Sequence, residues 1–443
     1  MPKINPNIFK TYDIRGIYPD ELNEEIAYRI GKTFISYTGA KKVAVGRDTR
    51  LSSPQLFRAL SKGIVERGAD VFDIGLVSID CLYFSVGHYG YDGGIMVTAS
   101  HNPKQWNGFK MVDKKVEVIS GEKIGQEIEK SKFLEVKQKG EIKEKNIWKD
   151  YLSHILSFVD VKKIKPFKVV IDASNAMAGK VIPFLQPKLP IKVIPLNFEL
   201  DGNFPAHPAN PLLEGVSDQI SEKIKEKKAD FGFIFDGDAD RIFLIDEMGN
   251  FIRADVTFLL LAKHFLKKNP GTAIAYNLIC SKAVPEFIKK WGGKPIRTAV
   301  GFINIQENMK KNNCVLGGEL SSHYCFRDNF YSDSGFIAFL VLLQVISEAG
   351  EKVSTLVTSL SSFAKSAEIN FEVEQKEAVL NKVKEHYSDG KQDYLDGVTV
   401  EYDDWWFNLR PSHTENLLRL TVEAKTKSLM AEKLKEITKI VKM

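Results

Sequence analysis

FGFIFDGDADR, residues 231–241, is a run of apolar residues that ends in a loop crowded with aspartates. A short apolar run bounded by a polar turn is typical of a buried strand. GGIMVTASHN from Gly93 and CVLGGELSSH from Cys314 have the same form. The sequence therefore predicts three buried strands, each ending in a loop that carries reactive side chains.

An earlier strand precedes each of these segments. KVAVGRDTR starts at Lys42, KVVIDASNAMAG at Lys168 and TAIAYNLICSKAV at Thr272, and each short run leads into a predicted helix. A strand, a crossover and a second strand bury such runs, so we expect three α/β domains of similar plan. Ligands of open α/β sheets lie at the carboxyl ends of the strands, so the three loops are expected to converge on one cleft.

The pattern changes after Ser362. The segments EINFEVEQ, GVTVEYDDWWFNLR and LLRLTVEAK alternate apolar and polar residues and are flanked by two helices rich in Lys and Glu, which predicts a small α+β domain with an antiparallel sheet. The predicted domains are residues 1–150, 151–252, 253–362 and 363–443. Within the first domain, the charged residues 121–146 predict a solvated helix and a hairpin.

The composition is that of a globular protein. The chain has 443 residues, of which 44% are hydrophobic and 27% are charged, and a formal net charge of +5. Lys and Arg are interspersed with acids rather than gathered into a basic arm, so we expect no nucleic-acid partner. The longest apolar stretch, residues 336–346, is too short to span a bilayer and predicts a buried helix.

The four cysteines lie far apart, without the spacing of a zinc site, which indicates reduced thiols. The N-terminal segment MPKINPNIFK lacks the apolar core of a signal peptide. We therefore expect a cytoplasmic protein, monomeric or homodimeric, that binds a small molecule and no membrane.

TASHNP, residues 98–103, places a hydroxyl, an imidazole and an amide in a turn after an apolar strand, where its side chains are expected to be exposed. Ser100 can act there as a nucleophile or carry a phosphoryl group if a neighbour such as Lys110 manages its proton. The pair Ser100 and His101 also fits a simple hydrogen-bonded turn. No G-x-S-x-G motif surrounds Ser100, which argues against a hydrolase of that type.

DGDADR, residues 236–241, sets three carboxylates at alternate positions, so that Asp236, Asp238 and Asp240 can reach one cation. Oxygen ligands alone favour magnesium or calcium. An EF-hand, with Glu247 as its last ligand, is disfavoured because Arg241 stands where that loop needs glycine. An acidic turn without metal is the alternative, although three packed aspartates repel one another unless a positive charge lies among them.

Two further loops carry polar side chains. GELSSH, residues 318–323, offers Glu319, Ser321 and His323 to the hydroxyls of a sugar. RPSHTEN, residues 410–416, can form a phosphate cradle from its backbone N–H groups and from Arg410, Ser412 and Thr414. Taken alone, GELSSH is better explained as an ordinary polar turn, and RPSHTEN fits a capping turn equally well.

Near the start of the chain, YDIRG contains Tyr12 and Arg15, and GRDTR contains Arg47 and Arg50. Loops of this kind suit anion contacts or salt bridges within a domain. For Arg47 and Arg50 we favour the structural role.

Together these loops resemble the α-D-phosphohexomutase superfamily, and within it the phosphomannomutase/phosphoglucomutase group. The resemblance covers nearly the whole chain, with YDIRG, TASHNP, DGDADR, GELSSH and RPSHTEN in the family's order. It implies four domains around a central cleft, three similar α/β domains and a smaller C-terminal α+β domain.

The resemblance also implies an activity and its site. A hexose 1-phosphate and a hexose 6-phosphate would interconvert through a phosphorylated Ser100, with Mg²⁺ as cofactor and a hexose 1,6-bisphosphate as intermediate and activator. The metal ligands would be Asp236, Asp238, Asp240 and the phosphate on Ser100. Residues near the transferred group would be His101, Lys110, Arg15 and Arg241, with Lys110 and His101 managing protons and Lys110 favoured of the two. Substrate contacts would come from Tyr12, Thr298, Gly301, Glu319, Ser321, His323, Arg410, Ser412, His413 and Thr414.

The sequence departs from the family pattern at three positions. Ser322 replaces a usual glycine in the sugar loop, and His413 and Asn416 differ from the usual phosphate loop. The choice among mannose, glucose and glucosamine phosphates stays open. A phosphoglucosamine mutase, a metal-dependent phosphatase and a non-catalytic phosphosugar-binding protein are the alternative functions.

Overall fold

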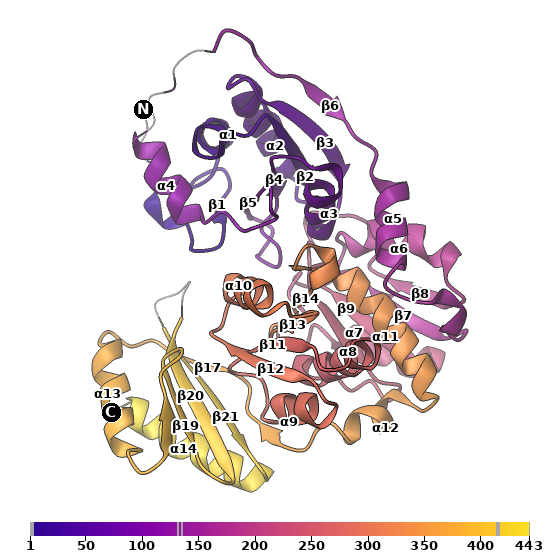
Figure 1. Cartoon of the computed structure of the whole chain (residues 1–443), viewed down its shortest axis with the longest axis vertical. Helices are drawn as coiled ribbons and strands as arrows, with labels where there is room; N and C mark the ends of the chain where they lie inside the picture. The colour runs from indigo at the N-terminus through magenta and orange to yellow at the C-terminus, as the bar shows by residue number, and fades with distance from the viewer. Residues whose placement is uncertain (1–3, 131–132, 134–135, 413–416, 443) are drawn as a thin grey trace.

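The structure, a computed structural model, describes residues 4–130, 133, 136–412 and 417–442, which form four β-sheets. We name the parts built on these sheets domains I to IV, in chain order. Figure 1 shows the domains in an arc, with domain IV beside domain III and facing domain I. The expected fold class, three α/β domains followed by a smaller α+β domain, is confirmed.

Domain I is a mixed sheet in the order β1-β5-β4-β2-β3-β6, with β2 parallel to both β3 and β4. Its buried strand β4 delivers the loop that contains Ser100. The strands are β1 (Ile14–Ile17), β2 (Lys42–Arg47), β3 (Asp70–Leu76), β4 (Gly93–Val97), β5 (Trp106–Asp113) and β6 (Ile142–Glu144). The helices are α1 (Glu24–Thr38), α2 (Ser53–Val65), α3 (Ile79–Tyr89), α4 (Gly121–Lys130) and, leading toward domain II, α5 (Trp148–Leu156).

The helix predicted within residues 121–146 is present as α4, but it is not fully solvated and the predicted hairpin is wrong. Helix α4 buries Ile124 and Ile128, 0% and 2% exposed, in the core of domain I. Strand β6 forms no hairpin but pairs in parallel with β3. Most residues of α4 are Lys, Glu or other polar residues, but its apolar residues lie on one face. This face is enough to pack the helix against the core of domain I.

Domain II is a four-stranded sheet in the order β10-β9-β7-β8. All five residues of β9 are buried, as expected for the apolar run before the aspartate loop. The strands are β7 (Lys168–Asp172), β8 (Lys192–Leu196), β9 (Phe231–Phe235) and β10 (Ile242–Ile245), and the helices are α6 (Ala178–Leu185) and α7 (Asp218–Lys227).

Domain III is a five-stranded sheet in the order β12-β11-β13-β14-β15. The predicted buried helix at residues 336–346 is confirmed as the central part of α11. The strands are β11 (Ala273–Asn277), β12 (Lys294–Thr298), β13 (Leu316–Gly318), β14 (Tyr324–Phe326) and β15 (Ser332–Asp333). The helices are α8 (Ala254–Lys268), α9 (Ala283–Lys290), α10 (Phe302–Asn312), α11 (Gly335–Ala349) and α12 (Val353–Thr358).

Domain IV is an antiparallel sheet in the order β16-β21-β20-β19-β18, with β17 also paired to β21. Its apolar face forms a separate core with two helices. The strands are β16 (Ala364–Lys365), β17 (Ile369–Phe371), β18 (Lys391–Asp393), β19 (Val398–Glu401), β20 (Trp405–Pro411) and β21 (Leu418–Ala424), and the helices are α13 (Lys376–His386) and α14 (Lys427–Lys442).

One continuous apolar core joins domains I, II and III, with α11 at its centre. Phe339 of α11 is 1% exposed, and its ring lies 5.2 Å from that of Phe233 and 6.4 Å from that of Phe235, both on β9. The core therefore fixes the strand that presents the aspartate loop. In the parts of the chain that the structure describes, no helix combines the length and hydropathy needed to cross a membrane.

Replacing Phe339 with alanine should lower the midpoint of thermal unfolding. The loss of a buried aromatic ring typically reduces the free energy of unfolding by about 3–5 kcal/mol. Phe184→Ala is the matched control, since Phe184 is 40% exposed and should matter far less. Differential scanning calorimetry compares the two, and an equal shift for both variants would contradict the central role of α11.

Candidate active site

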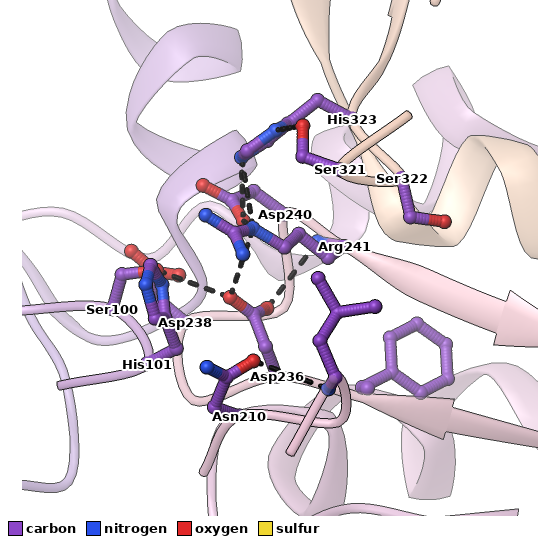
Figure 2. A network of polar contacts seen from close by, with 12 residues as sticks. Ser100, His101, Asn210, Asp236, Asp238, Asp240, Arg241, Ser321, Ser322 and His323 are labelled. Atoms are coloured by element: carbon purple, nitrogen blue, oxygen red, sulfur yellow. Dashed lines mark hydrogen bonds and ion pairs between the residues drawn. The ribbon is translucent and has the colours of Figure 1, made fainter. Parts of the chain in front are cut away.

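The loops that follow β4, β9 and β13 meet at one place, although they come from domains I, II and III (Figure 2). The Ser100 hydroxyl donates a hydrogen bond of 3.0 Å to Asp236 Oδ2. On the other side of the aspartate loop, His323 Nε2 lies 3.4 Å from Asp240 Oδ1. The predicted convergence of the three strand-end loops is therefore confirmed.

Ser100 is held rigidly, and its expected exposure is wrong. The residue is 1% exposed because the aspartate loop packs on it: a Cβ added to Gly237 would lie 2.3 Å from the Ser100 carbonyl oxygen. Its φ of +50° lies in the left-handed region. The buried Arg50 guanidinium donates to four backbone carbonyls of this loop, those of Ser100, Asn102, Pro103 and Trp106. Such strain at a reactive residue persists only where the surroundings impose it.

The favoured structural role of Arg47 and Arg50 is confirmed. Arg47 forms a 2.7 Å ion pair with Asp73, and Arg50 lies 3.2 Å from Asp48. Arg15 forms a 2.7 Å ion pair with Asp13, donates to the Ala99 carbonyl at 3.4 Å and also bonds Asn102. The Arg15 guanidinium thus borders the Ser100 loop.

The three aspartates form a buried acidic cluster. Asp236, Asp238 and Asp240 are at most 1% exposed, and an oxygen from each lies within 4.8 Å of the others. Burial raises the pKa of Asp236 well above its usual value, and the charges of Asp240 and Asp238 raise it further. Asp238 Oδ1 has no hydrogen-bond partner among the described residues, and Asp240 Oδ1 has only ion-pair contacts, 3.4 Å from His323 Nε2 and 3.9 Å from Arg241 Nε. Oxygen donors of this number and kind fit a hard divalent cation.

An EF-hand is excluded by the chain path. The loop continues directly into β10, and the Glu247 carboxylate accepts a hydrogen bond of 3.2 Å from the Ser354 backbone N–H instead of turning toward the aspartates.

Lys110 reaches this cluster from β5 of domain I. Its Nζ lies 2.8 Å from Asp238 Oδ2 and 2.6 Å from Asp240 Oδ2. Burial alone would lower the pKa of Lys110, but the charges of Asp238 and Asp240 outweigh burial and raise it. Lys110 is therefore a positive charge held against the aspartate cluster.

The pKa values of the two histidines are shifted in opposite directions. His101 Nδ1 lies 3.2 Å from the Ser100 hydroxyl, and burial, together with Arg241 and Arg15, lowers the pKa of His101 well below its usual value. Burial would also lower the pKa of His323, but the charge of Asp240 raises it to about 10. His323 Nε2 lies between Asp240 Oδ1, at 3.4 Å, and Arg241 Nε, which donates a hydrogen bond to it at 3.2 Å.

The sugar loop is tied to its neighbours. Glu319 Oε1 accepts a hydrogen bond of 2.9 Å from the Gly301 backbone N–H, and Ser321 Oγ lies 2.8 Å from His323 Nδ1. Tyr12 crosses from domain I to Gly301, where an added Cβ would lie 2.2 Å from the Tyr12 hydroxyl. The Thr298 hydroxyl is directed to the Ala299 carbonyl at 2.9 Å, so in this arrangement it stabilises the loop.

Ser322 adopts the conformation that glycine would favour. Its φ is +71°, in the left-handed region. Its hydroxyl donates to the Ile242 carbonyl at 2.6 Å and also bonds the Tyr324 hydroxyl at 2.9 Å. These bonds stabilise a serine in the strained position.

The phosphate loop lies on domain IV. Arg410 is 2% exposed at the end of β20, and its Nη2 donates to Glu368 Oε2 at 2.6 Å. Ser412 directly follows β20, whereas His413 and Thr414 lie outside the described residues. Domain IV joins domain III near the sugar loop, where the Val300 backbone N–H donates to Asp396 at 3.1 Å.

Sequence reasoning missed Asp333 on β15. It is 2% exposed, and one of its oxygens lies within 4.8 Å of ligand atoms of Asp240 and His323. Burial, and then the charge of Asp240, raises the pKa of Asp333 well above its usual value. In the sequence Asp333 precedes Ser334, the N-cap of α11, so it resembles an ordinary helix-capping residue.

The whole chain matches one protein family. Models of phosphoglucomutase/phosphomannomutase α/β/α domains I, II and III match residues 6–135, 149–249 and 253–363, and a model of the family's C-terminal domain matches residues 368–440. A phosphomannomutase of Vibrio cholerae is 40% identical over 98% of both chains. A phosphomannomutase of Methanocaldococcus jannaschii is 37% identical over 98% of this chain and 97% of its own.

The fold agrees with this match. The crystal structure of a phosphoglucomutase/phosphomannomutase family protein from Burkholderia thailandensis superposes with a TM-score of 0.90 at 30% identity, covering 99% of this chain and 98% of that one. Four matching domains, relatives aligned over nearly their full length and the shared arrangement of domains all agree. The chain belongs to the phosphoglucomutase/phosphomannomutase family and is a mutase.

Proposed function

We propose that this mutase interconverts the 1-phosphate and 6-phosphate of a hexose, mannose or glucose or both, through a phosphorylated Ser100. The observation that carries the proposal is the Ser100 hydroxyl, buried and hydrogen-bonded at 3.0 Å to an aspartate cluster that fits a divalent cation. A serine in this place can carry a phosphoryl group next to the charge that its transfer requires. The similarity to phosphomannomutases along the whole chain supports the sugar class.

The aspartates would hold magnesium together with an oxygen of the phosphorylated Ser100. When bound, the ion would neutralise charge on the transferred group, which is the main requirement of phosphoryl transfer. Lys110 and Arg241, which border the same aspartates, add fixed positive charge, and Arg15 borders the Ser100 loop.

The first transfer breaks the bond between phosphorus and Ser100 Oγ, forms a bond between phosphorus and O6 of the hexose 1-phosphate, and moves one proton from the O6 hydroxyl to Ser100 Oγ. The resulting hexose 1,6-bisphosphate then reorients in the site. The second transfer breaks the bond between phosphorus and O1, forms a bond between phosphorus and Ser100 Oγ, and moves one proton from Oγ to O1, so that hexose 6-phosphate leaves.

Two residues were candidates for managing these protons, and the geometry favours His101. It is neutral, and its Nδ1 is 3.2 Å from the Ser100 hydroxyl, so it can accept the proton that Oγ loses when it is phosphorylated again. Lys110 keeps its proton because two carboxylates hold it. We therefore assign Lys110 to charge neutralisation.

The substrate would lie between the sugar loop and domain IV. Glu319, Ser321 and His323 would bind its hydroxyls, with Tyr12 and Gly301 beside them, and Arg410, Ser412, His413 and Thr414 would hold the phosphate that is not being transferred. The small molecule is the only partner that this function requires.

Ser100→Ala should abolish isomerisation of mannose 1-phosphate and glucose 1-phosphate, because it removes the hydroxyl that would carry the phosphoryl group. Ser36→Ala, an exposed serine of α1, is the matched control and should retain wild-type rates. Intact mass and peptide mapping should find the phosphoryl group on residue 100 of the active wild-type protein. Near-normal turnover by the alanine variant would rule out the phosphoserine route.

Chelation should remove activity, and added Mg²⁺ should restore it. Because the pKa of Asp236 is raised, this carboxyl group holds its proton at higher pH than an ordinary aspartate, and the metal must displace that proton. The Mg²⁺ concentration needed for half-maximal activity should therefore rise as pH falls, and Asp238→Asn should raise it at every pH. A half-saturating concentration independent of pH and unchanged in Asp238→Asn would contradict the metal assignment.

A further inference from the structure

Asn277 lies at the end of β11, between two loops of the candidate active site. The sheet order β12-β11-β13 puts β11 in the middle, and β11 pairs in parallel with both neighbours. The carboxyl ends of the three strands therefore lie at one edge of the sheet. Gly301 follows β12 and Glu319 follows β13, so the end of β11 brings Asn277 between them.

The side chain of Asn277 bonds directly to Glu319. Its Nδ2 donates to Glu319 Oε1 at 3.4 Å, and the Gly301 backbone N–H donates to the same oxygen at 2.9 Å. A carboxylate oxygen offers about two acceptor sites, so these two donors occupy Oε1. The other oxygen, Oε2, lies 3.5 Å from His323 Nδ1. Oε2 is therefore the oxygen that can accept a hydrogen bond from a sugar hydroxyl.

Burial makes the orientation of this carboxylate depend on its donors. Asn277 is 1% exposed and Glu319 is 4% exposed. Burial alone would raise the pKa of Glu319, but His323 and the hydrogen bonds from Gly301 and Asn277 outweigh burial and lower it. Glu319 is thus a buried carboxylate ion, which accepts hydrogen bonds and donates none. Because so little of it meets water, a lost protein donor is poorly replaced.

A thiol fixes which end of the Asn277 amide faces Glu319. The chain turns after β11, and the Cys280 backbone N–H donates to the Asn277 carbonyl at 3.0 Å. This turn brings Cys280 Sγ within 3.0 Å of Asn277 Oδ1, to which the S–H donates. Burial raises the pKa of the Cys280 thiol, so its proton stays on sulfur. The thiol donor needs the amide oxygen and the carboxylate needs the amide N–H, so both partners select the same orientation.

We propose that Asn277 is a positioning residue for the sugar: it holds Glu319 so that Oε2 faces a sugar hydroxyl, and Cys280 keeps the Asn277 amide in the orientation this requires. The proposal rests on the proposed function, in which Glu319 binds the sugar, and extends it to the loop after β11. Asn277 acts through Glu319 rather than by contact with the substrate.

A double-mutant cycle tests whether Asn277 acts through Glu319. Binding of mannose 1-phosphate is measured by isothermal titration calorimetry in the full-length Ser100→Ala protein, where no transfer can occur. Asn277→Leu should weaken binding about tenfold, as expected for the loss of a hydrogen bond to a charged group, and Glu319→Ala should weaken it at least as much. With Glu319→Ala already present, Asn277→Leu should change the affinity by less than about twofold, because the group that it positions is gone.

Asn269→Leu is the matched control for Asn277→Leu. Asn269 lies just before β11, at the amino end of the strand, and its Nδ2 donates to the Phe265 carbonyl at 3.2 Å. This control should bind like the Ser100→Ala parent. Cys280→Ser keeps a donor to Asn277 Oδ1 and should also bind like the parent, whereas Cys280→Ala lets the amide turn over and should weaken binding about threefold.

A kinetic experiment separates positioning from general damage. With Ser100 intact, Asn277→Leu should raise KM about tenfold while kcat stays within about twofold, because Glu319 contacts the sugar and not the transferred group. If Asn277→Leu does not fold, as judged by its thermal unfolding, Asn277→Asp replaces it in every comparison. Aspartate has the size of asparagine, but its carboxylate repels Glu319 instead of donating to it.

Unchanged affinity in Asn277→Leu, or an equal loss of affinity with and without the Glu319 side chain, would overturn the role of Asn277. Equal affinities of Cys280→Ser and Cys280→Ala would overturn the role of Cys280. The proposed function fails separately, if the wild-type protein isomerises neither mannose 1-phosphate nor glucose 1-phosphate. A crystal structure of Asn277→Leu then still decides the role of Asn277, because a Glu319 carboxylate that keeps its wild-type orientation would overturn it.

Discussion

Three buried carboxylates cannot share a small volume without positive charge among them, and this requirement organises the whole site. Domain II supplies Asp236, Asp238 and Asp240, each at most 1% exposed. Arg241 of domain II borders these carboxylates, and Lys110 of domain I and His323 of domain III add further positive or hydrogen-bonding groups from the neighbouring domains. The same ion pairs that stabilise the buried aspartates therefore also connect domains I, II and III around Ser100.

Apolar packing and polar contacts have different roles in this arrangement. Domains I to III share one apolar core around α11, which makes their relative placement rigid. Domain IV keeps a core of its own and meets domain III through polar contacts, such as the 2.9 Å bond from the Lys282 backbone N–H to Glu423 and the 3.3 Å bond from Arg297 to Thr399. Interfaces of this polar kind permit relative movement of domains. The half of the site that binds the transferred group is thus fixed, and the half that would hold the other phosphate is attached more loosely.

The sequence predicts much of this architecture, because its strands are continuous apolar runs that end in distinctive loops. The convergence of the Ser100, Asp236 and His323 loops follows from the topology of parallel strands, and the structure confirms it; the four domain boundaries stay predictions. Contacts made across domains were not predictable: Ser100 is buried only because Gly237 approaches its backbone, and Asp333 looks like a capping residue until the fold brings it to Asp240. Likewise, nothing in the sequence pairs Asn277 with Glu319, 42 residues further along the chain. The sequence wrongly suggested full solvation and a hairpin for residues 121–146, because charged residues outnumber the two isoleucines by which α4 packs into the core of domain I.

The central claim is that the aspartate cluster holds a divalent cation next to Ser100. The most direct test is a crystal structure of the phosphorylated protein with Mn²⁺, read from its anomalous scattering. The account predicts one strong peak about 2.0–2.3 Å from an oxygen of each of the three aspartates and of the Ser100 phosphate, with Lys110 displaced from between the carboxylates. A peak elsewhere, with Lys110 still bridging Asp238 and Asp240, would contradict it.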